Sequence, residues 1–209
     1  MFGNRDVLVL TVGYTATIWG TAGLRQWIVV FLAFCVANQG DAATQGWSML
    51  MTGALVGLLG VPAGLFGNEL SLRLGLRPTA MGVLLVSVLV NALFGLAAML
   101  PYGAVVALAM IAGFVVQGNF SNLTSGLLAV AEPQLRGATV AVYSCIGFAG
   151  GFVGTLLFGL SLDWFGGTAR LAAWVAAFGI CAIACLIGAI ATAFLSDLGS
   201  ESFGPRAEM

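Results

Sequence analysis

Long apolar runs alternate with short polar stretches along the whole chain. An apolar run of about twenty residues crosses a bilayer as a helix, and these runs lack the strict alternation of a barrel strand. The pattern therefore predicts an all-α integral membrane protein with six transmembrane helices. The predicted spans are residues 7–36, 46–67, 79–100, 103–130, 138–162 and 169–195, and a polar cytoplasmic tail follows at 196–209.

Composition agrees with a chain embedded in lipid. Of the 209 residues, 60% are hydrophobic and only 7% are charged, with a mean hydropathy of +1.07. A soluble domain carries roughly 25% charged residues, which keep its surface in water. The lipid bilayer is therefore an expected partner. A net charge of -1 without any basic cluster argues against a nucleic-acid partner.

The chain contains no histidine. This absence excludes Ser-His and Cys-His nucleophilic catalysis and histidine metal ligation. The four cysteines lie inside apolar runs, where we expect them to be packing residues: Cys35, Cys145, Cys181 and Cys185. A membrane enzyme would need an acid, a base or a nucleophile in the membrane, and the sequence offers no convincing set. We expect no enzymatic activity, no cofactor and no metal.

Every basic side chain is an arginine, and the distribution of these arginines predicts the orientation. Six spans put both termini on one side of the membrane. That side holds Arg5, Arg73, Arg77, Arg136 and Arg206. The other side holds only Arg170. The positive-inside rule then places both termini in the cytoplasm of a multi-pass protein of the plasma or inner membrane.

Glycines recur every three or four residues in two of the spans. The second span carries Gly53, Gly57, Gly60, Gly64 and Gly67. The fifth span carries a similar cluster, GFAGGFVG, at residues 147–154. Such stripes let another helix backbone approach closely, for tight packing or for sliding at a moving interface. Pro62 predicts a kink in the second helix, and the almost wholly apolar third and sixth spans suit the lipid-facing outside of a bundle.

Arg25 lies deep in the first span. A mid-membrane arginine costs about 2.5–3.5 kcal/mol on insertion scales, so it usually faces a bundle interior or a wet cavity. At 100° per residue, Tyr14, Ile18, Thr21 and Arg25 share one narrow face, with Thr11 beside it. We interpret Tyr14, Thr21 and Arg25 as substrate-binding residues, and Arg25 points to a negative group on the solute. The alternative is that Arg25 reaches the outer interface or pairs with a structural partner.

The fourth span contains the polar stretch VVQGNFSNLTSG. Gln117, Ser121 and Thr124 share one face of a helix, while Asn119 and Asn122 lie roughly opposite. One face is expected to line a cavity and the other to hydrogen-bond a neighbouring helix. Gln117 is the best single substrate-binding candidate here because of its depth. Interhelical hydrogen bonding is the alternative role for these amides.

Three stretches resemble one family. NELSLRLGLRP, at 68–78, resembles the signature loop of major facilitator superfamily transporters, G-x-L-(A/S)-D-R-x-G-R-(R/K). The matching residues are Leu70, Ser71, Arg73, Gly75 and Arg77. Asn68 stands where the family has glycine, and Leu72 stands where it has aspartate.

The other two stretches lie around the fifth span. PQLRGATVA, at 133–141, resembles the family's P-x-x-R-G-x-A segment before the penultimate helix. GLSLDWFGG, at 159–167, resembles the signature again, with Asp163 and Gly166 aligned to Leu72 and Gly75. The two copies of the signature fall on opposite sides of the membrane, as a three-plus-three inverted repeat requires.

The resemblance implies both a fold and an activity. In this family two six-helix bundles bind a solute between them and expose it alternately to each side of the membrane. A degenerate signature is typical of the second copy of the loop, so the chain resembles the C-terminal half, as a fragment or as one chain of a split protein. The family's cytoplasmic gate implies gating roles for Glu69, Arg73, Arg77 and Arg136.

We therefore expect a small-molecule solute as ligand, and a separate N-terminal six-helix half or a second copy of the chain as partner. The chain would contribute one wall of the cavity. The alternative is a six-span membrane scaffold, or a homodimeric pore, without alternating access.

Overall fold

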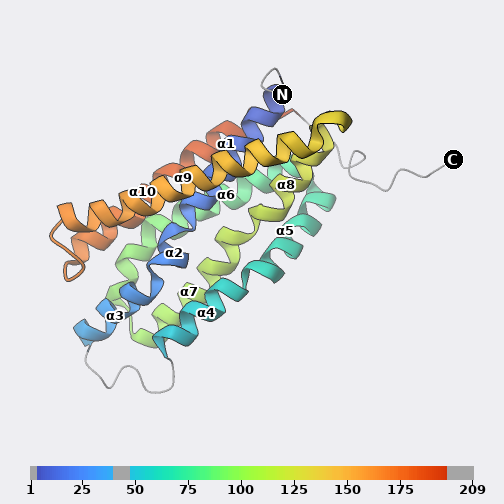
Figure 1. Ribbon diagram of the computed structural model, residues 1–209. Coiled ribbons are helices and arrows are strands. Elements are labelled where there is room, and N and C mark those ends of the chain that lie inside the picture. The colour runs from blue at the N-terminus through green and yellow to red at the C-terminus, as the bar shows by residue number, and fades with distance from the viewer. Residues whose placement is uncertain (1–3, 40–47, 197–209) are drawn as a thin grey trace.

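The computed structural model describes residues 4–39 and 48–196 (Figure 1). These residues are 89% helical and contain no strand. Six stretches are long and apolar enough to cross a membrane: Arg5–Gln26, Met49–Leu74, Leu76–Met99, Tyr102–Val130, Pro133–Trp164 and Leu171–Thr192. The predicted all-α class and the prediction of six apolar spans are confirmed. The predicted tail beyond Ser196, with Arg206, lies outside the described residues.

The first apolar run, predicted as one span over 7–36, consists of three helices: α1 (Arg5–Gly20), α2 (Ala22–Gln26) and α3 (Ile28–Gln39). Asn4 begins α1 by accepting the Asp6 backbone N–H (3.0 Å). The first interruption falls at Thr21, whose hydroxyl donates to the Ile18 carbonyl (2.7 Å). A threonine hydroxyl bonded to its own helix competes with the regular ladder and bends it.

The second and fourth spans are also interrupted. Helix α4 (Met49–Leu58) gives way at Leu59 to α5 (Gly60–Leu74), which contains Pro62 in its first turn. Proline has no N–H and clashes with the preceding turn, so the helix is interrupted beside Pro62, the residue at which a kink is predicted. Helix α7 (Tyr102–Gln117) meets α8 (Asn119–Val130) at Gly118. The first, second and fourth spans are therefore each built from more than one helix.

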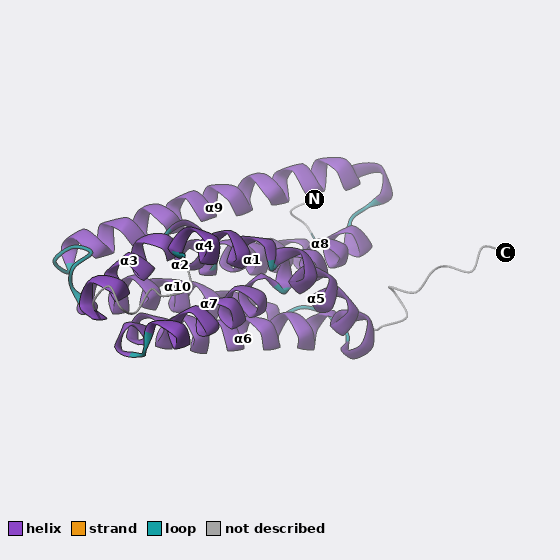
Figure 2. Cartoon of the chain, turned by 90° about the horizontal axis from the view of Figure 1, so that it is seen from below, coloured by secondary structure: helices purple, strands orange, loops and turns teal. Residues whose placement is uncertain are grey.

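The remaining spans have no interruption inside the α-helix. Helix α6 (Leu76–Phe94) ends in the 3-10 turn η2 (Gly95–Met99), and the 3-10 turn η3 (Pro133–Leu135) leads into α9 (Arg136–Trp164). The last span is α10 (Leu171–Thr192). The third and sixth spans, α6 and α10, pack extensively against each other. Figure 2 shows α9 and α6 on opposite sides of the bundle.

One face of the bundle follows the order α9, α1, α8, α5. Helix α1 packs against both α9 and α8, and α8 packs against α5 (Figure 1). Helices α6 and α10 lie behind this row, where each packs against α1. The first span is 67% buried, whereas the second is 22% buried and the fifth 28%. The centre of the bundle is therefore the first span, flanked by two helices that expose most of their surface.

The glycine stripes mark the closest helix contacts, as predicted. On α9, Gly147 packs against Tyr14 and Gly151 against Ile18, both on α1. On α5, Gly64 lies under the Ser121 hydroxyl, and Gly67 lies against the Gly118 carbonyl. A side chain on any of these four glycines would meet atoms of the neighbouring helix. The stripe does not extend to Gly57, where an added Cβ would meet nothing within 4 Å.

The signature stretch is a helical hairpin rather than an extended loop. Helix α5 continues through Glu69 and Arg73 to Leu74, and α6 begins at Leu76. The connection is the single residue Gly75, with φ +91° and ψ 156°. Only glycine adopts this conformation at little cost. Leu76 is fully buried and packs against Gly126 of α8, which fixes the start of α6.

Candidate functional site

A polar groove of about 500 Å³ opens on the face formed by the first, second and fourth spans. It is lined by Tyr14 in the second half of α1, by Asn68 in the second half of α5 and by residues from the first to the last turn of α8. Its lining residues are Tyr14, Asn68, Phe120, Ser121, Thr124, Ser125 and Leu128. The groove brings together three helices that are distant in sequence.

Tyr14 forms one side of the groove, as its predicted role requires. Its ring stacks on Tyr143 of α9 (centroids 4.1 Å apart, planes at 22°) and meets the edge of Phe120 (5.9 Å, 85°). The stack depends on Gly147, because a side chain there would collide with the Tyr14 ring. Tyr14 is only 8% exposed, and its ring is held by packing against α8 and α9.

The polar side of the groove is held by one interhelical hydrogen bond. Ser125 Oγ lies 3.0 Å from Asn68 Oδ1 and joins α8 to α5. Thr124 donates its hydroxyl to the Phe120 carbonyl (2.8 Å) within α8. Ser121 Oγ faces Gly64, which has no side chain to cover it. Asn68 therefore keeps its amide group for other partners, and the Ser121 hydroxyl stays open to the groove.

Arg25 lies outside the groove, at the end of the apolar stretch Arg5–Gln26. Gly23, two residues earlier, packs against Phe178 of α10 and Phe158 of α9. Trp27, two residues later, packs against Gly159 of α9. Gly159 is five residues from the end of α9 at Trp164, about 8 Å at 1.5 Å per residue, so Arg25 lies near that end of the bundle rather than at its middle. Its side chain is exposed and pairs with no carboxylate of the described residues.

Thr21, the third predicted substrate-binding residue of this span, is 4% exposed. Its hydroxyl caps the end of α1 through the bond to Ile18. The predicted stripe over α1 and α2 is therefore divided: Tyr14 lines the groove, Thr21 shapes the helix end, and Arg25 is exposed beyond the interruption.

Gln117 is 3% exposed and its amide group is occupied by structural bonds. Nε2 donates to the Val56 carbonyl of α4 (2.9 Å) and to the Gly113 carbonyl one turn earlier (2.9 Å). It is absent from the groove lining. The structure thus places Gln117 in the interhelical role that was the alternative to substrate binding.

The opposite face of the fourth span joins it to α6. Asn119 Nδ2 donates to the Ala80 carbonyl (3.1 Å), and Asn122 Nδ2 donates to Asn119 Oδ1 (3.0 Å). Both asparagines are fully buried. The predicted division of this span into a cavity face and a bonding face is confirmed for Ser121 and Thr124 on one side, and for these asparagines on the other.

The four predicted gating residues lie at one end of the bundle. Arg73 Nε is 2.8 Å from Glu69 Oε1, and the two side chains are 73% and 55% exposed. This is a local pair one helical turn apart. Arg77 is half-buried and Arg136 is exposed at the start of α9. Neither forms an ion pair with another described residue.

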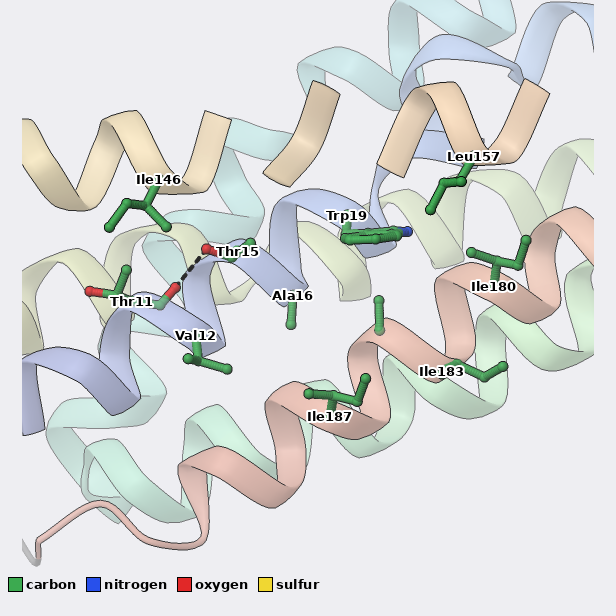
Figure 3. Close-up of a pocket in the computed structure, with 11 residues that line it drawn as sticks. Thr11, Val12, Thr15, Ala16, Trp19, Ile146, Leu157, Ile180, Ile183 and Ile187 are labelled. Atoms are coloured by element: carbon green, nitrogen blue, oxygen red, sulfur yellow. Dashed lines mark hydrogen bonds between the residues drawn. The ribbon is translucent and has the colours of Figure 1, made fainter. Parts of the chain in front are cut away.

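An apolar groove of about 500 Å³ lies on another side of the bundle, between α9 and α10 over α1 (Figure 3). Side chains of isoleucine and valine line it, with Trp19 across it. Its two hydroxyls, those of Thr11 and Thr15, each donate to a carbonyl of α1 (2.7 and 2.8 Å). Apart from the buried Trp19 indole N–H, which has no hydrogen-bond partner among the described residues, the lining offers no unbonded polar group, so this groove suits hydrocarbon.

The sequence pattern did not identify Asn68, Ser125 or Tyr143 as members of the polar site. In the sequence, Asn68 was noted only because it replaces the glycine of the family's signature. The asparagine side chain that replaces this glycine bonds to Ser125 of α8. Tyr143 is 1% exposed and belongs to the glycine-rich span, where it has the pattern of a core residue.

No protein-family model matches the chain, and no curated protein matches it either. The resemblance to the major facilitator superfamily is therefore carried by the motifs of the chain itself. Function has to be inferred from the arrangement of polar and charged side chains in the membrane-spanning bundle.

Proposed function

We propose that the chain is one half of an alternating-access transporter of the major facilitator type, corresponding to the C-terminal half, and that it moves a small solute across a membrane. One observation carries the proposal. Arg25 is exposed near the end of the apolar stretch Arg5–Gln26 and has no counter-charge among the described residues. An exposed arginine without a counter-charge is costly to hold against hydrocarbon, so we infer that the surface around it meets water or another protein.

The distribution of polarity supports the same assignment. The polar groove lies on the α1–α8–α5 part of the bundle. The exposed residues of α6 and α10 are large and apolar: Leu85, Val86, Leu89 and Leu93 on α6, and Ile183, Leu186, Ile187 and Ile190 on α10. Helices α5 and α9 also expose large apolar side chains, among them Leu65, Phe66, Phe148 and Phe152. We infer that α6 and α10 face lipid, while the polar groove forms part of one wall of a central cavity.

The turn geometry supports an internal repeat of three plus three spans. Gly75 ends the first signature copy with φ +91°, and Gly166, aligned with it, follows α9 with φ +105°. With Gly167, these are the three residues of positive φ in the described chain. The two turns lie at opposite ends of the bundle, as an inverted repeat requires.

The missing wall would come from a partner with its own six-helix half. A symmetric pair of identical chains docked around Arg25 would bring two guanidinium groups together in a medium of low dielectric. The charge therefore favours a distinct N-terminal half over a second copy. Arg5, Arg73, Arg77 and Arg136 lie at one end of the spans, and the positive-inside rule makes that end cytoplasmic.

Solute accumulation by cells tests the proposal. Cells would express the chain with and without an N-terminal half that carries an intact signature loop, and uptake of solutes would be compared. We expect accumulation only with both halves, and its loss in an Arg25→Ala variant that still inserts. Normal uptake by the inserted variant would contradict the role of Arg25.

The scaffold or homodimeric pore makes a different prediction in the same assay. A scaffold gives no flux with any partner, and a pore gives flux from the chain alone that equilibrates the solute without accumulating it. Either result would replace the proposed half-transporter.

A further inference from the structure

We propose that the polar groove is a binding site for an uncharged, hydroxyl-bearing solute with an apolar ring face, of the size of a monosaccharide. This inference rests on the proposed function for its biological meaning, because it names the class of solute that the half-transporter would carry. It departs from the sequence-based expectation of a negative group, which depended on Arg25.

The first argument is charge. None of the residues that line the groove carries a charge. Arg25 is eleven residues from Tyr14 along the first span, about 16 Å at 1.5 Å per residue, and is absent from the lining. An anion in the groove would lose its hydration without gaining a cation, which is strongly unfavourable in a membrane protein. The groove therefore selects for a neutral ligand.

The second argument is the supply of hydrogen-bonding groups. The Ser125 hydroxyl lies 3.0 Å from both Asn68 Oδ1 and the Asn122 carbonyl and shares its one proton between them. Asn68 Nδ2 has no hydrogen-bond partner among the described residues, so its two protons remain for a ligand. The hydroxyls of Tyr14 and Ser121 form no hydrogen bond with another described residue. Each hydroxyl can donate and accept. This mixture of donors and acceptors matches a ligand whose own hydroxyls do both.

The third argument is a buried hydroxyl behind the groove wall. Tyr143 Oη is fully buried and satisfies no hydrogen-bond geometry with a described residue, although it lies beside the Thr124 hydroxyl. Thr124 lines the groove and already donates to Phe120. A buried polar atom without a partner is costly. A ligand hydroxyl at Thr124 would extend the polar network of the groove to this atom.

The aromatic residues set the shape of the ligand. Tyr14 and Phe120 meet edge to face at 5.9 Å and both line the groove, while Leu128 adds an apolar contact. A sugar ring has hydroxyls at its rim and C–H groups on its faces, so it can contact the aromatic rings while its rim reaches Asn68 and Ser121. The groove volume of about 500 Å³ accommodates such a ring.

Saturation-transfer difference NMR on the purified full chain tests the inference, since this method detects weak binding to a half site. The detergent must lack a sugar head group. The probes are D-glucose, D-glucuronate and D-glucosamine, which share the pyranose ring and differ in charge. We expect saturation of the glucose ring protons, and weaker signals from the anion and the cation.

Groove variants identify the site. Ser121→Ala should weaken the apparent glucose affinity about fivefold, as expected for one lost hydrogen bond. Tyr14→Phe should have a similar effect, while it keeps the ring stacked on Tyr143. Thr155→Ala is the matched control, because Thr155 is half-buried on α9 and its hydroxyl donates to Gly151 (3.0 Å).

Three outcomes would overturn the inference: no saturation of glucose, stronger saturation of glucuronate that disappears in Arg25→Ala, or glucose binding that survives both groove variants. The measurement requires no partner and no flux. If the chain binds glucose at the groove but supports no uptake with any partner, the binding site is confirmed and the proposed transport function is wrong.

Discussion

Gly67 of α5 lies directly against the carbonyl group of Gly118, at the junction of α7 and α8. A Cβ on Gly67 would collide with the Gly118 carbonyl oxygen, and backbone cannot move aside as a flexible side chain can. The contact fixes the second span against the fourth immediately beside Asn68. The position of the polar groove therefore depends on a residue that has no side chain.

The Gly67→Ala substitution should destabilise the bundle. Overpacking of a tight contact typically lowers the free energy of unfolding by about 1–3 kcal/mol. We expect a loss at the upper end of this range, because the added Cβ would meet the Gly118 backbone, which cannot rotate away. Thermal unfolding in detergent, followed by tryptophan fluorescence, measures the effect. Gly57→Ala on the same stripe is the control and should be neutral or slightly stabilising, because its Cβ meets nothing within 4 Å. Equal effects of the two substitutions would contradict the assigned contact.

Gln117 is expected to act as a structural residue. Gln117→Leu removes the bond to the Val56 carbonyl, and interhelical hydrogen bonds in membranes are worth about 0.6–1.7 kcal/mol. We expect a fall of about 1 kcal/mol in the free energy of unfolding in detergent, with unchanged affinity of the folded protein for the groove probe. A variant of normal stability that no longer binds the probe would restore the substrate-binding role of Gln117.

Arg25 should oppose insertion of the first span. Replacing a mid-span arginine by leucine changes the insertion free energy by about 3 kcal/mol, and Arg25, near the end of the stretch Arg5–Gln26, should show part of this shift. A glycosylation-based insertion assay on Arg25→Leu measures this shift. Arg73→Leu is the matched control, since Arg73 is exposed in the last turn of α5 and should have little effect. A small effect at both positions would show that Arg25 reaches an interface.

The Glu69–Arg73 pair should contribute little to stability. Exposed pairs one turn apart are worth about 0.3–0.5 kcal/mol, and salt weakens them. Glu69→Gln is therefore expected to change the unfolding free energy of the isolated chain by less than about 0.5 kcal/mol. An effect of several kcal/mol, or one that high salt fails to reduce, would indicate a further partner for Glu69.

The spans and the close helix contacts were predictable, because apolar length and small-residue spacing are local properties of the sequence. The interruption at Thr21 was not predictable from the sequence, because a threonine is compatible with either a continuous or a bent helix. The contact of α10 with the neighbouring Gly20 is a tertiary feature that the local sequence does not show. The partner of Gln117 is a backbone carbonyl, which has no sequence signature. Asn68 and Ser125 are 57 positions apart and meet only because glycines bring α5 and α8 together.

The single-residue turn at Gly75 also bears on how the protein is made. Residues on either side of it are already helical, so the second and third spans have no slack between them. During synthesis the one-residue connection keeps the second and third spans adjacent, so neither can insert in the bilayer far from the other. The two must enter together as a preformed hairpin, and a lengthened connection at Gly75 would release them to insert one at a time.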